Sequence, residues 1–331
     1  MRITSSVTSV SWIPSEAVKG LSRLVFDLGV VLYDRPPPDR IGPLDELVER
    51  HEFRFAQRLD AWIDVERGRV TGYGQSGHGV LGATRVGVGE RRMAFPAVEF
   101  PDIRHDPIVG DDYVTFSQTA GGRTALPAPR RVGRRPFVRV EPPIAWTTLS
   151  LTLRASGGVE RGVVGASPFP RHWIYDDGGE LVAKTGLIDF KSWYADAFGL
   201  RTPWGAEDSP AIVTEVESAL ERELSSTIMR GGERPEVRQL PAGARLVEQG
   251  APGDELYVLL DGVVRVEVDG EPLAEVGPGA ILGERALLEG GTRTSALVTV
   301  TPARVAVARG DAVDRAALAE VARGHRREEG R

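Results

Sequence analysis

The chain contains no cysteine among its 331 residues. This absence excludes disulfides, thiolate catalysis and cysteine-based metal sites. No other spacing typical of metal ligands, such as His-x-x-x-His, is present either, so we expect no metal. A chain without disulfides fits a reducing compartment most simply. We therefore expect a cytoplasmic protein.

Long apolar runs are also missing. The N-terminus alternates polar and apolar residues without the apolar centre of a signal peptide, and no later stretch is long enough to span a bilayer. We expect no export and no membrane partner. The formal net charge is −6 and the pI is near 5.6, so the chain as a whole is not expected to bind nucleic acid.

Aromatic residues are scarce in the last third of the chain. All 6 Trp and all 10 Phe lie at or before Trp204, and Tyr257 is the only tyrosine beyond it. The length suits two domains, each with a core of its own. We predict a β-rich domain over residues 1–204, a linker with a relay helix over 205–232, and a second domain over 233–331.

The first of these domains is predicted to be mainly β. Alternating or β-branched runs are separated by Gly, Pro and Asp, which is typical of strands joined by turns. A barrel and a sandwich are both consistent with this pattern. The predicted strands cover residues 6–13, 55–65, 113–119, 137–140 and 146–153.

An amphipathic helix is predicted over residues 211–230. Ser209 would cap it, Pro210 would occupy its first turn, and an apolar stripe follows at helical spacing. Short strands separated by turn residues come next, as in a β jelly roll, and a last helix is predicted from Asp311. The strands are predicted at residues 245–248, 256–260, 263–268, 273–276, 296–301 and 304–308.

The strongest chemistry lies in the segment 283–296. Gly283 opens a predicted one-turn helix, where backbone N–H groups can approach an anion closely. Arg293 offers two parallel donors to phosphate oxygens. Glu284 accepts hydrogen bonds only, which suits a ribose hydroxyl, and Thr294 and Ser295 can add hydroxyl hydrogen bonds.

This segment resembles the phosphate-binding cassette of the cyclic-nucleotide-binding domain found in catabolite-activator proteins, cyclic-nucleotide-dependent kinases and gated channels. The upstream hairpin is similar too, with its glycines and alternating apolar residues at 250–266. The resemblance covers about 75 residues, and both motifs occur within it at the spacing of the family. It implies a jelly roll with flanking helices. The implied nucleotide-binding residues are Gly283, Glu284, Arg285, Ala286, Arg293, Thr294 and Ser295.

The resemblance leaves the base of the nucleotide open. In the family, Thr directly after the cassette arginine can favour guanine, and Thr294 is compatible with cGMP without requiring it. We expect cAMP, with cGMP or a pyrimidine nucleotide as alternatives, and no other cofactor. Two features depart from the family: Arg285 replaces the usual Leu, Ile or Met, and no aromatic residue follows Asp311 to cover a purine.

The N-terminal domain shows no catalytic constellation, since neither a phosphate loop nor a Gly-x-Ser-x-Gly elbow is present. Residues 116–123, 167–176 and 189–194 could line a small-molecule pocket, but packing is the favoured interpretation. His172 with Asp176 or Asp189 is the sole acid–base candidate. The basic run 129–139 could hold a phosphate or a nucleic-acid backbone, although a solvated edge strand explains it better.

We predict a cyclic-nucleotide sensor for signal transduction, in which the helix 211–230 relays ligand binding allosterically to the β-rich domain. One alternative is a nucleotide-regulated enzyme acting on a small molecule, and another is an interaction module that binds no ligand. In that module Arg293 would be a solvated charge and Glu284 a helix-terminal carboxylate. A catabolite-activator-type transcription factor is disfavoured, because only about 20 residues follow Asp311, too few for a helix-turn-helix there. A homodimer is compatible with the sensor.

Overall fold

The computed structural model separates into two compact units, Met1–Ala211 and Ile212–Arg331. Each unit is described by itself. The described residues are 1–14, 36–50, 53–82, 84–88, 91–95, 97–124, 128–131, 138–141, 144–185, 202–204, 213–214, 219–230, 235–309 and 315–324.

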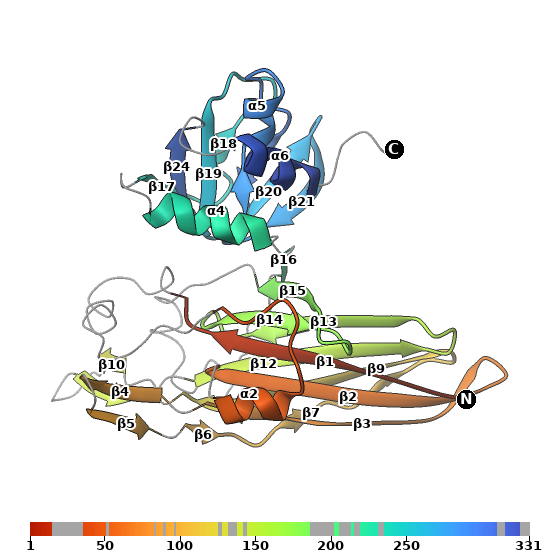
Figure 1. Ribbon diagram of the computed structural model, residues 1–331. Helices are drawn as coiled ribbons and strands as arrows, with labels where there is room; N and C mark the ends of the chain where they lie inside the picture. The colour runs from red at the N-terminus through yellow and green to blue at the C-terminus, as the bar shows by residue number, and fades with distance from the viewer. Residues whose placement is uncertain are drawn as a thin grey trace. The chain divides into compact units, whose positions relative to one another are not determined.

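Unit 1 contains two antiparallel sheets of long strands (Figure 1). Within unit 1, the strands of the first sheet have the order β15 (Leu181–Thr185), β14 (Arg171–Tyr175), β1 (Arg2–Trp12), β2 (Phe55–Glu66) and β3 (Arg69–Leu81). The second has the order β13 (Val159–Ala166), β12 (Ile144–Arg154), β9 (Tyr113–Arg123) and β6 (Val98–Glu99). The short strands β7 (Ile103–Arg104) and β8 (Ile108–Val109) also pair with β9.

Smaller elements complete the described part of unit 1. They are helix α2 (Leu44–Arg50), the strand pair β4 (Thr84–Val88) and β5 (Arg91–Phe95), and the strand pair β10 (Ala128–Arg131) and β11 (Val138–Glu141). Residues 129–131 and 138–139 of the basic run lie on the β10–β11 pair, and residues 132–137 lie outside the described residues.

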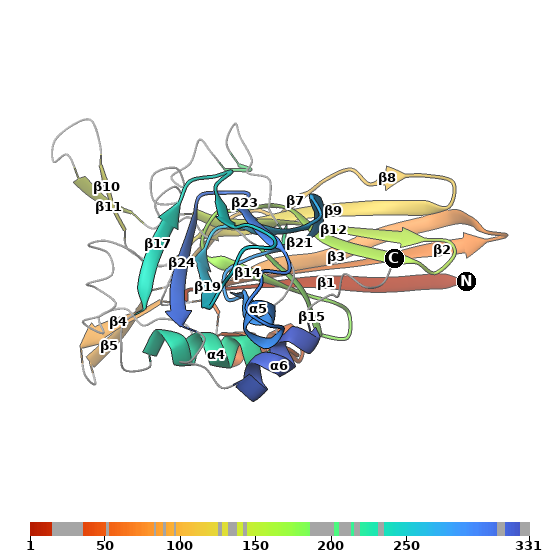
Figure 2. The same ribbon diagram turned by 90° about the horizontal axis from the view of Figure 1, so that it is seen from above.

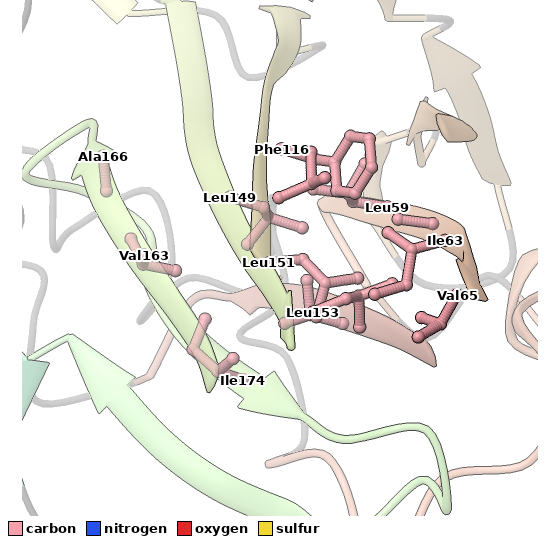
Figure 3. Close-up of a cluster of buried hydrophobic side chains, with 13 residues drawn as sticks. Leu59, Ile63, Val65, Phe116, Leu149, Leu151, Leu153, Val163, Ala166 and Ile174 are labelled. Carbon is pink, nitrogen blue, oxygen red and sulfur yellow. The ribbon is translucent and has the colours of Figure 1, made fainter. Parts of the chain in front are cut away.

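The described strands of unit 1 form a sandwich rather than the barrel that the sequence left open. Strand pairing within each sheet is antiparallel, and the core lies between the sheets. Figure 3 shows this core, where Leu59 and Ile63 of the first sheet meet Phe116, Leu149 and Leu151 of the second. All five side chains are fully buried. The alternation of apolar residues along β2 and β12 places them on this inner face.

A buried polar cluster continues the interior beyond that apolar core. The hydroxyls of Ser9 and Thr147 lie 3.0 Å apart, and Thr147 donates to Gln57 Oε1 at 2.6 Å. Gln57 Nε2 in turn donates to the backbone carbonyl of Gln118 at 2.8 Å. Ser9 and Gln57 belong to one sheet, whereas Thr147 and Gln118 belong to the other. These buried hydrogen bonds therefore link the two sheets of unit 1.

Unit 2 begins with the short strand β16 (Val213–Thr214) and helix α4 (Ala219–Arg230). Two four-stranded antiparallel sheets follow, as expected for a jelly roll. One sheet has the order β17 (Glu236–Leu240), β24 (Ala303–Arg309), β19 (Glu255–Asp261) and β22 (Ile281–Leu282). The other has the order β18 (Arg245–Val247), β23 (Ala296–Thr299), β20 (Val264–Val268) and β21 (Glu271–Val276).

The Asp269-Gly270 turn between β20 and β21 matches the sequence prediction. Both residues have positive φ, 51° and 84°, as a two-residue turn of the type favoured in hairpins requires. The predicted strands of unit 2 are confirmed in position. Strands β17 and β22 were not predicted, because five and two residues carry too little alternation to be recognised.

The predicted helix over 211–230 is confirmed only in its second half. Helix α4 covers Ala219–Arg230, whereas Val213 and Thr214 form a strand, so the prediction was wrong there. Two consecutive β-branched residues favour extended backbone, and the apolar stripe outweighed that signal in the prediction. The predicted cap, Ser209-Pro210, lies outside the described residues.

Three helices of unit 2 pack together. Leu220, Leu224 and Ile228 of α4 share a cluster with Leu287 and Leu288 of α5 (Glu284–Leu288) and with Leu318 and Val321 of α6 (Arg315–Gly324). Figure 2 shows α5 and α6 side by side. Arg315 Nη2 also donates to the carbonyl of Leu287 at 3.0 Å. Within the described part of the chain, no helix is both long and apolar enough to cross a membrane.

Candidate functional site

The segment predicted to bind phosphate lies between β22 and β23 and includes α5. Gly283 precedes the helix with φ 90° and ψ 4°, a left-handed conformation that glycine adopts without a steric penalty. Glu284, the first residue of α5, is 5% exposed, and Ala286 is 1% exposed. The backbone N–H of Gly291 donates to Ala286 O at 2.6 Å and closes the turn that returns the chain toward Arg293.

Arg293 is the central side chain of this segment and is only 5% exposed. Its Nη1 donates to the backbone carbonyls of Glu255 at 2.9 Å and Gly283 at 3.3 Å. Its Nη2 lies 3.5 Å from the hydroxyl of Tyr257, and its Cζ lies 5.3 Å from the centre of the Tyr257 ring. These contacts fix the planar guanidinium in one orientation, as bidentate binding of two oxygens of an anion requires.

Two glycines make room for this guanidinium. A Cβ atom at position 253 would overlap Nε and Cζ of Arg293, and one at 283 would overlap Nη1. The backbone around Gly253 is tied to the same loop, because Gly253 N–H donates to Gly291 O at 2.9 Å and Arg293 N–H to Ala251 O at 2.8 Å. The sequence reveals both glycines, but the overlap with Arg293 becomes evident only in the fold.

The contacts of Arg293 leave one pair of donors available. Nη1 is used by two carbonyls, and one N–H of Nη2 can be used by Tyr257. Nε is buried and has no hydrogen-bond partner among the described residues. The N–H groups of Nε and Nη2 on this side of the guanidinium are parallel, and such a pair matches two oxygens of a phosphate. A buried donor without a partner costs free energy that an anionic ligand would recover.

The remaining predicted site residues surround Arg293 in the chain. Arg285, Thr294 and Ser295 are half-buried, so their side chains are partly accessible to solvent. The carbonyl of Arg285 accepts a backbone hydrogen bond from Glu289. Contact of these residues and of Glu284 with a nucleotide stays a prediction.

A neighbouring ionic network was not found from the sequence. Arg238 of β17 donates from both terminal nitrogens to Glu255, at 2.8 and 3.1 Å, and from Nε to Glu236 at 3.0 Å. Tyr257 donates its hydroxyl to Glu255 Oε2 at 2.7 Å. The hydrogen bond from Arg238 is the main cause that lowers the pKa of the Glu255 carboxyl. Burial, followed by the hydrogen bond to Glu255, raises the pKa of Tyr257.

Comparison with known proteins decides the family of this unit. The family model described as cyclic nucleotide-binding domain matches residues 237–319. Residues 237–319 are a cyclic nucleotide-binding domain. The match includes Arg238, Glu255 and Tyr257 of the ionic network, the hairpin and the segment from Gly283 to Ser295, whereas Glu236 and unit 1 lie outside it.

Curated relatives match between 60 and 92 residues of the chain. A cyclic nucleotide-gated potassium channel of Mesorhizobium japonicum is 32% identical over 92 residues, which are 28% of this chain and 21% of the channel. A CRP-like cAMP-activated global transcriptional regulator of Mycobacterium tuberculosis is 35% identical over 69 residues, 19% of this chain and 31% of the regulator. A cGMP-dependent protein kinase of Caenorhabditis briggsae is 35% identical over 60 residues, 18% of this chain and 8% of the kinase.

The chain thus spans between 8% and 31% of the length of these three relatives. Among solved structures, a cyclic nucleotide-binding domain from Methylobacillus flagellatus is 27% identical. That match covers 28% of this chain and 62% of the other, with a TM-score of 0.23.

His172, the acid–base candidate of unit 1, lies in a closed environment. Its ring is fully buried, with Nε2 3.0 Å from the carbonyl oxygen of Ser167 and Nδ1 next to the hydroxyl of Ser11. A carbonyl only accepts, so Nε2 carries the proton and Nδ1 accepts from Ser11. Burial lowers the pKa of His172 to about 4. A neutral imidazole with both nitrogens bonded inside the core is a packing residue.

Asp176, one of the two carboxylates proposed as partners of His172, is used elsewhere. It accepts from the backbone N–H groups of Gly178 and Glu180, both at 2.9 Å, and so stabilises a turn. Asp189 lies outside the described residues. Of the three segments considered as pocket linings, 189–194 is likewise outside them, whereas 116–123 lies in β9 and 171–175 in β14.

Proposed function

We propose that the chain is a sensor of a cyclic nucleotide, in which the cyclic phosphate binds the Nε and Nη2 donors of Arg293. One observation carries this proposal. Arg293 is buried and held by two carbonyls, and its Nε has no hydrogen-bond partner among the described residues. A buried cation with a parallel pair of donors is suited to an anion with two free oxygens.

Glu284 is proposed to accept a hydrogen bond from the ribose hydroxyl of the ligand. It stands at the first position of α5, and Arg293, Thr294 and Ser295 follow a few residues after the end of that helix. We favour cAMP as the ligand and keep cGMP as the alternative. The relatives' names support both, since one is activated by cAMP and another depends on cGMP.

Ligand binding is proposed to act on the rest of the chain through the helices of unit 2. Leu287 and Leu288 of the cassette helix share one apolar cluster with α6 and with α4. A nucleotide that changes the position of α5 would therefore change the packing of α4, which precedes the domain in sequence. The domain limits 1–204, 205–232 and 233–331, a homodimer and a cytoplasmic location are further proposals.

Calorimetric titration of the whole chain with cAMP and cGMP tests the sensor. We expect saturable binding of at least one nucleotide and a loss of at least about 100-fold in affinity for Arg293→Ala, since a charge-assisted pair is removed. Arg265→Ala is the matched control, because Arg265 is paired with Glu275 on a neighbouring strand of the same domain. Absence of binding to both nucleotides contradicts a cAMP or cGMP sensor and supports the interaction module.

A further inference from the structure

The ionic network beside Arg293 has a place in nucleotide recognition. We propose that Arg238 sets the affinity for the cyclic phosphate by neutralising Glu255, a carboxylate that otherwise competes with the ligand for the charge of Arg293. This inference rests on the proposed function and adds two residues outside the cassette to it. Arg238 is a positioning residue, because it acts on the phosphate through other side chains.

Glu255 contacts Arg293 in two ways. Its backbone carbonyl accepts from Nη1 of Arg293 at 2.9 Å, so the arginine is held against residue 255. Its Oε2 accepts from the Tyr257 hydroxyl at 2.7 Å, and that hydroxyl oxygen lies 3.5 Å from Arg293 Nη2. Donation to a carboxylate makes the phenol oxygen a better acceptor, so Glu255 strengthens the hold of Tyr257 on Arg293.

Arg238 opposes this effect from a different strand. It approaches Glu255 across β24 and binds both carboxylate oxygens, at 2.8 and 3.1 Å. The side chains of Arg238 and Glu255 are 34% and 33% exposed, so solvent screens the pair only in part. With Arg238 present, the charge of the Glu255 carboxylate is compensated by a cation bonded directly to it. Without it, a negative charge remains next to the site where a phosphate must bind.

The sign of the expected effects follows from these charges. Arg238→Ala should weaken nucleotide binding, because the exposed charge of Glu255 repels the phosphate and attracts Arg293. Glu255→Gln should bind at least as tightly as the parent, because glutamine can still accept from Tyr257 without a charge. Combining both changes should restore binding, since the charge of Glu255 that Arg238 compensates is then absent as well.

The experiment compares dissociation constants by calorimetry for the parent chain, Arg238→Ala, Glu255→Gln and the double variant, each with cAMP and cGMP. We expect Arg238→Ala to raise Kd about threefold to tenfold, and the double variant to return within about twofold of the parent. The increase should shrink between about 0.05 M and 0.5 M salt, because screening acts on the uncompensated charge. Arg245→Ala is the matched control, since Arg245 of β18 pairs with Glu248 just after that strand, and its Kd should equal that of the parent.

The outcomes separate this inference from the proposed function. If the parent binds neither nucleotide, the proposed function fails and the inference fails with it. If the parent binds and Arg238→Ala has the same Kd, only the inference fails. A weakened Arg238→Ala that the second change does not rescue shows a purely structural role and also overturns the inference. Rescue together with salt dependence supports it, because loss of packing alone produces neither.

Discussion

Gly253 lies against the guanidinium of Arg293, close enough that a Cβ atom at 253 would overlap Nε and Cζ. The two residues are 40 positions apart in sequence, and the loop hydrogen bond from Gly253 N–H to Gly291 O brings them together. The position of the cassette arginine therefore depends on a residue without a side chain in the preceding hairpin.

Gly253→Ala should displace Arg293 and weaken nucleotide binding by at least about tenfold, the loss expected when a charge-assisted hydrogen bond is misplaced. Calorimetric titration measures this. Gly162→Ala is the control, because a Cβ there meets nothing within 4 Å. An affinity equal to that of the parent would contradict the packing of Gly253 on Arg293.

The overlap at Gly253 also predicts a coupling in stability. In ligand-free protein, Gly253→Ala should lower the free energy of unfolding of unit 2 in the parent and have a much smaller effect in Arg293→Ala, where the overlapping atoms are gone. Hydrogen exchange of unit 2 amides in the full chain measures this difference in unfolding free energy. Equal effects of Gly253→Ala in both backgrounds would refute the coupling.

The buried histidine predicts a pH dependence of the stability of unit 1. The pKa of His172 is about 4 in the fold and near 6.5 when unfolded, so the unfolded chain binds the proton first. Stability is therefore lost as the pH falls from about 6.5 toward 4, by on the order of 2 kcal/mol at pH 5. All Trp residues lie at or before Trp204, so tryptophan fluorescence follows the unfolding of unit 1 selectively.

His172→Gln should remove this contribution. The variant is expected to be less stable than the parent at pH 7, because the hydrogen bonds to Ser11 and Ser167 are disturbed, yet its stability should fall less steeply below pH 6.5. An unchanged slope would show that other groups cause the acid sensitivity.

The polar cluster between the sheets gives a further prediction. Thr147→Val keeps the shape of the side chain but removes the hydroxyl that joins Ser9 to Gln57. Burying the amide oxygen of Gln57 without that donor should lower the free energy of unfolding by about 1–3 kcal/mol. Urea titration with tryptophan fluorescence measures it, and Val164→Ala, at a side chain that is 55% exposed, serves as a control. A change below about 0.5 kcal/mol in Thr147→Val would contradict this role.

Local patterns predicted most elements of unit 2 and several strands of unit 1. The Asp269-Gly270 turn and the alternation along β2 and β12 are signals that neighbouring residues carry themselves. The pairing of β1 with β14, in which Ser11 lies opposite His172, joins residues 161 positions apart. Such long-range pairing depends on the packing of the whole sandwich, so the sequence could not distinguish a barrel from a sandwich.

The candidate site was predictable to a similar extent. Arg293 and Gly283 stand out because they lie in one short segment with a characteristic spacing. Arg238 does not, because a surface arginine on a five-residue strand looks like any solvated charge until strand order places it across from Glu255. For the same reason the burial of Nε of Arg293, on which the proposed function depends, is visible only in the fold.

The affinity of Arg293→Lys for cAMP and cGMP tests the central claim most directly. Lysine keeps the positive charge but cannot present the parallel donors of Nε and Nη2. If the cyclic phosphate binds that pair, calorimetry will show an affinity at least about tenfold below that of the parent for the nucleotide that binds. An affinity equal to that of the parent would mean that charge alone suffices and would contradict the account.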